Sequence, residues 1–314
     1  MWRQIRFPQS RSRAMEQERI VYLNGKMVPD SQALVSIEDR GFLLGDGCFD
    51  TTRTFNHKIF KLSEHLDRWF DSLQYLRIDI GMDKAKVADL TMQVLEANLP
   101  MIGKEDDLWV TQKATRGLRG VTEKPKPTVI IETRAIPFKS RGHYYSEGIP
   151  LIVASVRRTP PESLSPRVKS HNYLNLIMAD LEVKSRDPNA WAITLDVNGN
   201  LAEGDGSNIF VVKNGAVFTP RTNFVLGGIS RQTTIELAHE IGIEMVEKDI
   251  DLFDAYTADE MFVTATSICI CPVSSINGAK IASGKVPGPI TSRLLEAYSG
   301  LVGKDIVRQF TREL

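Results

Sequence analysis

The chain has 314 residues, of which 42% are hydrophobic and 25% are charged, and 39 basic residues balance 39 acidic ones. Length and composition predict one or two domains with a large core. The balanced charge argues against nucleic acid or an anionic membrane as a partner, and no apolar run approaches the roughly 20 residues of a spanning helix. The three cysteines, Cys48, Cys269 and Cys271, are too sparse for a disulfide framework or a metal clip and suit a reducing cytoplasm.

The first residues are basic, since four arginines precede the first acidic residue, Glu16. This composition resembles a transit peptide, but Pro8 and the lack of apolar periodicity favour a disordered extension. We therefore expect residues 1–19 to be disordered, and Met15 is an alternative start of translation.

The hydrophobic pattern of residues 20–137 predicts a small domain of mixed strands and helices. One helix begins near Ser63, its expected N-cap, and carries an apolar stripe at helical spacing. In chain order the expected elements are a hairpin over 20–28 that turns at Asn24-Gly25, a strand within 41–55, the helix after Ser63, a helix over 84–99, and strands over 108–115 and 128–136.

Residues 138–148 are polar and contain Gly142, and we expect them to link this domain to a larger one over 149–314. The expected elements of the larger domain are strands over 150–157, 191–196, 208–213, 260–264 and 271–276, helices over 174–185, 230–241 and 289–302, and turns at Asn198-Gly199, Asn214-Gly215 and Asn277-Gly278. This order lacks the regular strand–helix alternation of a doubly wound sheet. The sequence therefore predicts a mixed α/β fold rich in hairpins.

A lysine between an apolar run and a helical run is the first candidate for chemistry. Lys169 lies in Arg167-Val168-Lys169-Ser170-His171-Asn172-Tyr173, between the expected strand over 150–157 and the helix over 174–185. An enclosed lysine amine is suited to form a Schiff base with a carbonyl cofactor. The ordinary alternative is a solvated surface lysine.

Two features downstream match the other needs of a pyridoxal phosphate cofactor. Its ring nitrogen needs an acid, and Glu203 lies in the glycine-rich turn Glu203-Gly204-Asp205-Gly206, with Asp205 as a competitor for that role. Its phosphate needs donors, and Gly227-Gly228-Ile229-Ser230 opens a helix whose first N–H groups are free. Taken separately, these features are also typical of an ordinary turn and an ordinary capped helix.

Several arginines and hydroxyl groups are candidates for anion binding. On a helical wheel Arg68 lies away from the apolar stripe of its helix, so the pattern alone predicts a solvent-exposed side chain. Arginine forks match carboxylates, which makes Arg53, Arg116 and Arg119 candidates for a substrate carboxylate. Thr264-Ala265-Thr266-Ser267 closes a strand with hydroxyl groups, which suits such contacts or a plain β-turn.

Other catalytic constellations are not supported by the sequence. It contains no serine nucleophile elbow and no clustered set of metal-ligating residues, and its five histidines are scattered. Gly45-Asp46-Gly47 lacks the lysine-serine ending of a P-loop.

Together these motifs resemble the fold-type IV (class IV) pyridoxal-phosphate aminotransferases. That family includes branched-chain, D-amino-acid and (R)-selective amine aminotransferases and aminodeoxychorismate lyase. The match is continuous from about Tyr22 to Gly303. It is carried by Gly45-Asp46-Gly47-Cys48-Phe49, Glu64-His65-Leu66-Asp67-Arg68, Lys169-Ser170-His171-Asn172-Tyr173, Glu203-Gly204-Asp205-Gly206-Ser207-Asn208-Ile209-Phe210 and Gly228-Ile229-Ser230-Arg231.

The resemblance implies a role for each cofactor residue. Lys169 would form the Schiff base and carry the proton, and Glu203 would bind the pyridine nitrogen. Arg68 would bind the phosphate, which overrules the surface interpretation of this side chain, and Tyr173 would approach the phenolic oxygen of the cofactor. The remaining residues that it assigns to pyridoxal 5′-phosphate are Ser207, Asn208, Gly228, Ile229, Ser230 and Thr266.

The resemblance also implies the architecture and the reaction. We expect a small N-terminal and a larger C-terminal pseudo-barrel domain, a cytoplasmic homodimer, and ping-pong transfer of an amino group from an aliphatic or branched-chain amino acid to a 2-oxo acid. The alternatives are a D-amino-acid or (R)-amine aminotransferase and, less favoured, the lyase. The branched-chain enzymes usually have tyrosine–x–arginine where this chain has Trp109-Val110-Thr111. The substrate residues we expect are Phe49, Thr51, Arg53, Arg116, Arg119, Thr266 and Ser267.

Overall fold

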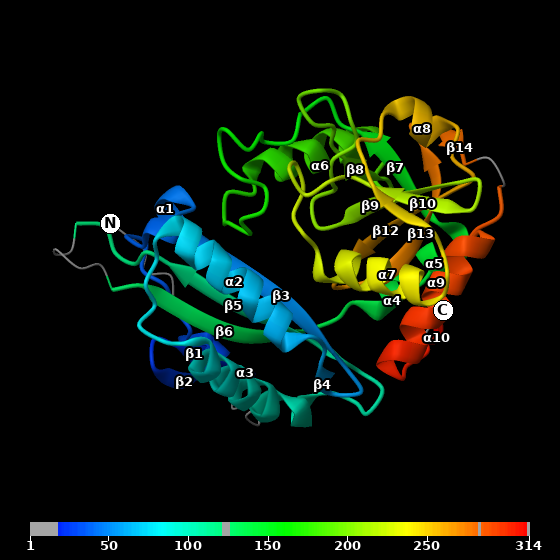
Figure 1. Cartoon of the computed structure of the whole chain (residues 1–314). Coiled ribbons are helices and arrows are strands. Elements are labelled where there is room, and N and C mark those ends of the chain that lie inside the picture. Colours follow the sequence, from blue (N-terminus) through cyan, green and yellow to red (C-terminus); the bar gives the residue numbers. More distant parts are fainter. Residues whose placement is uncertain (1–17, 121–125, 282–283, 313–314) are drawn as a thin grey trace, which may run out of the picture.

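The computed structural model describes residues 18–120, 126–281 and 284–312. Within them the strands form two separate sheets, and helices pack on each sheet (Figure 1). Residues 1–17 of the extension expected to be disordered lie outside the described part. Arg19 departs from that expectation, because its guanidinium forms ion pairs with two carboxylates.

The first sheet is antiparallel in all of its described pairings. Its strands follow the order β2-β1-β6-β5-β3-β4. Asn24 and Gly25 close the first hairpin with positive φ angles of 48° and 93°, as a tight turn between twisted strands requires. The strands are β1 (Ile20–Leu23), β2 (Lys26–Pro29), β3 (Gly47–Phe55), β4 (Lys58–Ile59), β5 (Leu108–Thr115) and β6 (Thr128–Ala135).

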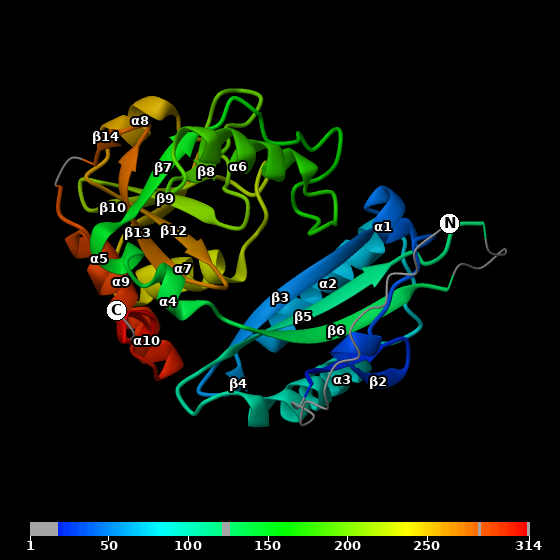
Figure 2. The same cartoon turned by 180° about the vertical axis from the view of Figure 1, so that it is seen from behind.

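Two helices, α2 (Leu62–Leu76) and α3 (Lys84–Asn98), cover one face of this sheet (Figures 1 and 2). The predicted stripe of α2 packs inward, and Leu66, Trp69 and Leu73 are buried in a core shared with α3 and the sheet. Burial of such a stripe, rather than helix propensity, supplies most of the stability of a helix of this length. The apolar spacing therefore predicted this layer correctly.

The boundaries of two elements differ from the prediction. Ser63 is not the N-cap of α2, because Lys61 takes that position with a left-handed φ of 49°. The strand expected within 41–55 begins at Gly47, because Asp39 caps a short helix, α1 (Arg40–Leu44), before it. Two 3₁₀ turns, η1 (Asp30–Gln32) and η2 (Leu99–Met101), complete the first half.

The second sheet is mixed, with the order β11-β10-β9-β12-β13-β7-β8 and β14 paired to β13. The pairs β10–β11, β13–β7 and β7–β8 are parallel, and the others are antiparallel. Its strands are β7 (Ile149–Val153), β8 (Trp191–Ile193), β9 (Asn208–Lys213), β10 (Ala216–Thr219), β11 (Met245–Glu247), β12 (Glu260–Ala265), β13 (Cys269–Ile276) and β14 (Ala279–Lys280).

Helices pack against the edge strand β8 and against the central strands of this sheet. α6 (Leu174–Arg186) contacts β8, while α7 (Ile229–Glu240) and α9 (Pro289–Val302) pack on each other and on β12 and β13. The sequence pattern predicted these three helices to within one or two residues. It missed β10, β11, α8 (Leu252–Tyr256) and α10 (Ile306–Thr311), which are all short. None of the helices described is long and apolar enough to cross a membrane.

The stretch expected to be a polar linker is folded instead. Residues 138–148 contain the short helices α4 (Phe138–Arg141) and α5 (Tyr144–Glu147). The rings of Phe138 and Tyr145 are buried against Phe310 of α10, with ring centroids 4.9 and 5.0 Å apart. These aromatic anchors pack the connection onto the second sheet's core, an effect that the polar composition of the stretch did not reveal.

The two sheets meet beside the lysine that the sequence singles out. The amide of Phe49 on β3 donates to the Lys169 carbonyl at 3.0 Å, and the His171 amide donates to the Gly47 carbonyl at 2.8 Å. A backbone bridge also pairs Cys48 with Ser170. The edge of the first sheet thus holds the lysine segment of the second half of the chain.

Candidate active site

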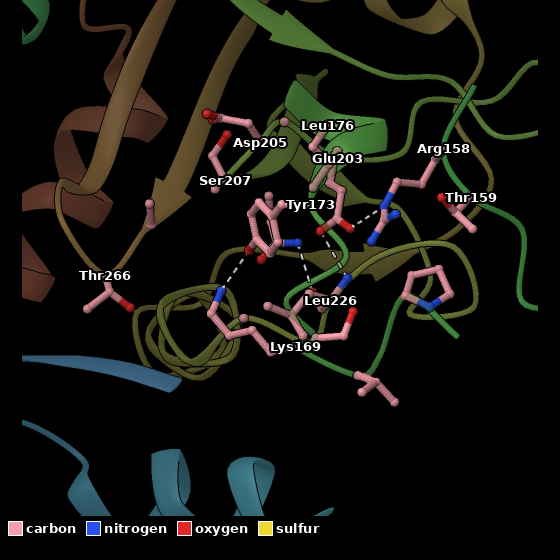
Figure 3. Close-up of a pocket in the computed structure, with 18 of the residues that line it drawn as sticks. Arg158, Thr159, Lys169, Tyr173, Leu176, Glu203, Asp205, Ser207, Leu226 and Thr266 are labelled. Carbon is pink, nitrogen blue, oxygen red and sulfur yellow. Dashed lines mark hydrogen bonds and ion pairs between the residues drawn. The ribbon is translucent and has the colours of Figure 1, made fainter. Parts of the chain in front are cut away.

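One cavity brings together all of the residues predicted to bind a cofactor (Figure 3). They come from α2, from the lysine segment, from the turn before β9, from the start of α7 and from the end of β12. The predicted residues that line it are Arg68, Lys169, Tyr173, Glu203, Ser207, Asn208, Gly228, Ile229, Ser230 and Thr266.

Lys169 presents its amine inside this cavity rather than on an outer surface. Its Nζ donates to the Tyr173 hydroxyl at 3.2 Å and lies 4.8 Å from the centroid of the Phe49 ring (Figure 3). Its backbone is fixed by the bond from Phe49 and by a 3.3 Å bond from its own amide to the Ser72 hydroxyl. The solvated-lysine alternative does not apply here, because aromatic rings and a hydroxyl surround the amine.

Glu203 lies in the turn that precedes β9 and is 5% exposed. Its Oε1 accepts a hydrogen bond from Arg158 Nε at 2.7 Å, and its Oε2 accepts one from the Leu226 amide at 2.9 Å (Figure 3). Burial raises the pKa of this carboxyl, although the charge of Arg158 acts in the opposite direction. Glu203 is therefore a buried acid that holds a proton more readily than an exposed glutamate does.

Asp205, the competitor of Glu203, lines the same cavity but is held differently. The residue is exposed, and no hydrogen bond to its carboxylate occurs among the described residues. Figure 3 shows its carboxylate pointing away from that of Glu203. An acid that must keep a ring nitrogen protonated needs a fixed direction, which Glu203 has and Asp205 lacks.

The start of α7 supplies the anion-binding end of the cavity. Gly228 is the N-cap, no side chain caps this helix, and Ile229 and Ser230 follow on the cavity wall. A Cβ at Gly228 would lie 2.2 Å from Asn208 Oδ1, so the close packing of this turn requires glycine. Free N–H groups and the positive end of the helix dipole favour a dianion here.

Arg68 reaches the same end of the cavity from α2. Its Nε and Nη2 donate to the two carboxylate oxygens of Asp50 at 2.7 and 2.8 Å, and its Nη1 donates to the Gly227 carbonyl at 2.9 Å. The helical-wheel prediction of a solvent-exposed arginine is therefore wrong. It failed because α2 has a second contact face, opposite its apolar stripe, that lies against the other half of the chain.

Sequence reasoning missed the residues that hold Arg68 and Glu203 in place. Asp50 on β3 is fully buried and accepts from both Arg68 and His65, whose Nδ1 lies 2.7 Å from Asp50 Oδ1. Burial alone would raise the pKa of Asp50, but Arg68 and His65 outweigh it and hold the pKa well below its usual range. The available signal was an aspartate within an otherwise apolar and threonine-rich strand. For Arg158 the sequence offered no signal.

Arg53, predicted to bind the substrate carboxylate, is placed elsewhere by the structure. It is 2% exposed, its Nη2 donates to Gln309 Oε1 at 2.9 Å, and its guanidinium stacks on the Phe55 ring at 4.1 Å. Its Nη1 also donates to the Ser267 carbonyl at 3.4 Å. Arg53 therefore fastens β3 to the second half of the chain, because a buried guanidinium must fill its donors with protein acceptors.

The other predicted substrate residues divide between the cavity and its surroundings. Arg116 is tied to Asp46 and to the last carbonyls of α2, and Arg119 is an exposed residue outside the cavity wall. Thr51 pairs its hydroxyl with that of Thr111 at 3.0 Å. Thr266 alone among the predicted substrate residues lines the cavity, while Phe49 reaches it through its contact with the Lys169 amine.

The described residues contain no cluster of three metal-ligating side chains. All three cysteines are free and buried, as the sequence predicted for one face of a strand at Cys269 and Cys271. The chemistry available in the cavity is therefore that of an amine, a proton-holding acid and an anion cradle.

Comparison with known proteins agrees with this set of cavity residues. The family model described as amino-transferase class IV matches residues 47–276. A protein assigned as a branched-chain-amino-acid aminotransferase in Methanocaldococcus jannaschii is 39% identical over 286 residues, which cover 90% of this chain and 96% of that protein. The D-alanine aminotransferase of Bacillus licheniformis is 30% identical over 289 residues, with 90% and 96% covered.

A solved structure shares the fold as well. The branched-chain aminotransferase of the thermophilic archaeon Thermoproteus uzoniensis, solved with norvaline, superposes with a TM-score of 0.81 at 28% identity, covering 91% of this chain and 95% of that one. The resemblance stated from the sequence motifs is thus confirmed. This chain belongs to the class IV aminotransferases, and it is an aminotransferase of mixed α/β fold.

Proposed function

We propose that this aminotransferase uses pyridoxal 5′-phosphate held in the cavity of Lys169. The observation that carries the proposal is that an amine, a buried acid and an uncapped helix start line one cavity. The Thr264 hydroxyl supports it, because this buried group on the cavity wall has no hydrogen-bond partner among the described residues. A bound ligand with acceptor oxygens would fill that gap. The chemistry of the donor set matches each end of the cofactor.

The residues divide the binding of the cofactor among them. Lys169 would join its aldehyde, Glu203 would face its ring nitrogen, and the amides of Ile229 and Ser230 would bind its phosphate together with Arg68 and Thr266. When bound, the cofactor supplies an electron sink for the electrons released at the donor carbon. Ser207 and Asn208 support the turn between these ends, since Asn208 Nδ2 donates to the Leu226 carbonyl at 2.9 Å.

The protein's own groups would manage the protons. The Lys169 amine would take a proton from the donor carbon and return it, and the Tyr173 hydroxyl, 3.2 Å from the amine, would orient it. Glu203 would keep a proton at the ring nitrogen, which its burial favours. Arg68 cannot swing away from the anion end, because Asp50 fixes two of its nitrogens.

We infer that the donor is an aliphatic or branched-chain amino acid and that a 2-oxo acid, such as 2-oxoglutarate or pyruvate, accepts the nitrogen in a ping-pong cycle. The named branched-chain relatives, one of them solved with the aliphatic amino acid norvaline, support this choice. The second candidate is a D-amino-acid donor, which the D-alanine aminotransferase relative supports. An (R)-amine donor or a lyase reaction uses the same cofactor residues. A donor panel of L-leucine, D-alanine and (R)-1-phenylethylamine separates these activities.

The test of the cofactor proposal is spectroscopic. Purified protein supplied with pyridoxal phosphate should absorb at roughly 410–430 nm, and an amino donor should bleach this band. Lys169→Ala should abolish both the band and turnover, whereas Lys58→Ala, at an exposed residue of β4, should change neither. An active Lys169→Ala variant with the normal band would refute the assignment of this lysine.

We also propose that the enzyme works as a cytoplasmic homodimer. On α6, apolar residues at positions i, i+3, i+4 and i+7 are exposed, and α1 with the loop before it exposes a second apolar set. Both lie in the upper half of the molecule in Figures 1 and 2. The residues of these two sets are Leu174 (68% exposed), Ile177 (46%), Met178 (48%), Leu181 (57%), Leu34 (77%), Ile37 (73%), Phe42 (73%) and Leu44 (56%).

A second copy of the chain is the occupant we propose for these surfaces, because a lone amphipathic helix with its apolar face outward is unfavourable in water. Light scattering should give twice the chain mass, and an Ile177→Glu/Leu181→Glu variant should shift the mass toward one chain. An active wild-type enzyme that stays monomeric at micromolar concentration would refute the dimer. The buried, unpaired thiols suit a reducing compartment such as the cytoplasm.

A further inference from the structure

The hydroxyl group of Ser72 joins the lysine segment to the helix that carries Arg68. It accepts a hydrogen bond from the Lys169 amide at 3.3 Å and donates one to the Arg68 carbonyl at 3.0 Å. Because an amide N–H can only donate and a carbonyl can only accept, these two partners fix the orientation of the hydroxyl group. Ser72 is 1% exposed, so its hydroxyl is committed to these protein partners rather than to bulk water.

Two consecutive residues of β3 make a second connection between the same two partners. The Phe49 amide donates to the Lys169 carbonyl at 3.0 Å, and the Asp50 carboxylate binds the Arg68 guanidinium. With Ser72 these contacts form a closed ring, which runs from the Lys169 amide through Ser72, Arg68, Asp50 and Phe49 back to the Lys169 carbonyl. The ring lies within one chain, so a partner copy is not needed to complete it.

This ring joins the two ends of the cavity that a cofactor must span. Lys169 carries the amine, and Arg68 lies at the anion-binding end, where it also donates to the Gly227 carbonyl. A ligand with an aldehyde and a phosphate has its own separation between these groups, so the protein must hold its two ends at a matching separation. A misplacement of about 1 Å in such an arrangement can cost on the order of 100-fold in rate.

We propose that Ser72 is a positioning residue, which sets the place of the Lys169 amine relative to the anion-binding end of the cavity. Ser72 does not line the cavity itself and acts through the main chain of Lys169 and Arg68. The Lys169 amine condenses with the cofactor aldehyde and releases one water molecule, a step that requires the amine at the aldehyde carbon. The inference rests on the proposed cofactor function and adds the residue that links its covalent and anionic anchors.

A purely structural role for Ser72 is the alternative, because serine and threonine hydroxyls inside helices often donate to the carbonyl four residues earlier. Thr91 on α3 shows such a role away from the cavity. Its buried hydroxyl donates to the Val87 carbonyl at 2.8 Å and accepts from the Gln112 side chain at 3.1 Å. Thr91 therefore makes the same two kinds of hydrogen bond without a connection to the lysine segment, and Thr91→Val is the matched control.

The test measures the Kd of two ligands by equilibrium dialysis. Pyridoxal phosphate engages both ends of the cavity, whereas pyridoxamine phosphate has no aldehyde for Lys169 to join. Ser72→Ala should raise the Kd of pyridoxal phosphate by on the order of 10-fold, because a buried amide loses its acceptor and Lys169 loses its fixed place. The Kd of pyridoxamine phosphate should rise less, since Asp50 still holds Arg68. Thr91→Val should leave the ratio of the two Kd values unchanged.

A double-variant cycle shows whether Ser72 acts through Lys169. In the Lys169→Ala background, Ser72→Ala should leave the Kd of pyridoxal phosphate unchanged within about 2-fold, since the amine that it positions is absent. Ser72→Cys keeps the volume of the side chain with a weaker hydrogen-bonding group, and it should show the same pattern as Ser72→Ala at a smaller size.

Three results would overturn the inference: an unchanged Kd of pyridoxal phosphate in Ser72→Ala, an equal rise for both ligands, or a rise that persists in full without Lys169. Each of them, with a fall in Tm like that of Thr91→Val, would leave Ser72 a residue of the fold alone. A wild-type protein that does not bind pyridoxal phosphate would instead refute the proposed cofactor function.

Discussion

Two buried carboxyl groups lie near the candidate active site, one in each half of the chain, and each is bound by an arginine. Asp50 on β3 pairs with Arg68, and Glu203 before β9 pairs with Arg158. Asp50 is 0% exposed and Glu203 is 5% exposed, so the two are similarly removed from water. Their pKa values nevertheless move in opposite directions, downward for Asp50 and upward for Glu203.

The difference lies in how many hydrogen-bond donors each carboxylate receives, since one arginine pairs with each group. Burial raises the pKa of both groups, but Asp50 receives two guanidinium nitrogens at 2.7 and 2.8 Å and the His65 ring at 2.7 Å. Glu203 receives one guanidinium nitrogen at 2.7 Å and one neutral amide at 2.9 Å. One arginine therefore does not decide the charge of a buried acid. Asp50 is built as a permanent anion that orients Arg68, and Glu203 as an acid that is able to hold a proton.

The largest expected effect concerns that proton. Glu203→Gln keeps the size of the side chain and its acceptor for the Leu226 amide but removes the exchangeable proton. Cofactor binding should persist, while proton removal from the donor should slow by on the order of 10²–10⁴-fold. Single-turnover kinetics with an amino donor, followed by the cofactor absorption, measure this rate.

Asp205→Asn is the matched comparison for the Glu203 prediction, because Asp205 competed for the same role. It should reduce the rate less than Glu203→Gln does. The reverse ranking would assign the ring-nitrogen role to Asp205 and would show that hydrogen-bonded orientation is a poor guide in this cavity.

The second prediction tests the permanent anion. Asp50→Asn leaves the Arg68 guanidinium charged and without its carboxylate, since arginine cannot release its proton at accessible pH. We expect the free energy of unfolding to fall by about 3–5 kcal/mol in urea titrations. Asp67 lies on the same helix as Arg68, and Asp67→Asn, which breaks its exposed pair with Lys84 of α3, should cost under about 1 kcal/mol. Equal costs for the two variants would contradict the buried-pair interpretation.

The pH dependence of the Asp50 effect has a definite sign. The pKa of Asp50 is lower in the folded protein than in the unfolded chain, so its contribution to stability is present above the unfolded value of about 4 and declines as pH falls below it. The stability difference between wild type and Asp50→Asn should therefore be constant from pH 6 to 8 and should shrink below about pH 4.

These two carboxyl groups also show what sequence could and could not predict. Apolar periodicity placed the helices α2, α3, α6, α7 and α9, because each buries a stripe in a hydrophobic cluster of its own half of the chain. The lysine, the glycine-rich turn and the helix start were placed because each belongs to a local motif. Glu203 was identified in this way, although its partner Arg158 lies 45 residues away in sequence.

Local sequence patterns could not predict the contacts between the two halves of the chain. A helical wheel assumes that one face meets the protein and the other meets water, and Arg68 violated that assumption because α2 touches both halves. Arg53 failed for the opposite reason. The match between arginine forks and carboxylates suggested an available charge. Residues more than 200 positions downstream, including Gln309, instead enclose the Arg53 side chain. The same long-range closure turned the expected polar linker into two packed helices.

The smallest expected effect completes the comparison of the two acids. Arg158→Met removes the charge that opposes the burial of Glu203, so the pKa of Glu203 should rise further. Glu203 can then take up a proton and become neutral, whereas Arg68 cannot lose its charge in Asp50→Asn. The free energy of unfolding should fall by about 1–3 kcal/mol at pH 8. At that pH Glu203 is either deprotonated without its cationic partner or takes up a proton where the pH disfavours protonation. At pH 5 the cost should be smaller.

The sign of that pH effect follows from the raised pKa of Glu203. A carboxyl whose folded pKa exceeds its unfolded value binds more protons in the folded state, so its folded form is favoured at low pH and loses stability as pH rises. Because Arg158→Met raises the pKa of Glu203 further, it widens the pH range over which the folded protein loses stability. In urea titrations at pH 5 and pH 8, the free energy of unfolding of the variant should approach that of wild type at the lower pH. The Glu203→Gln/Arg158→Met double variant should lose less stability than the sum of the losses in the two single variants. The double variant removes both charges, so neither charge is left without its partner. A cost that is the same at both pH values, with additive single variants, would mean that Arg158 stabilises the loop by packing alone. The contrast with Asp50 would then come from burial rather than from the number of hydrogen-bond donors.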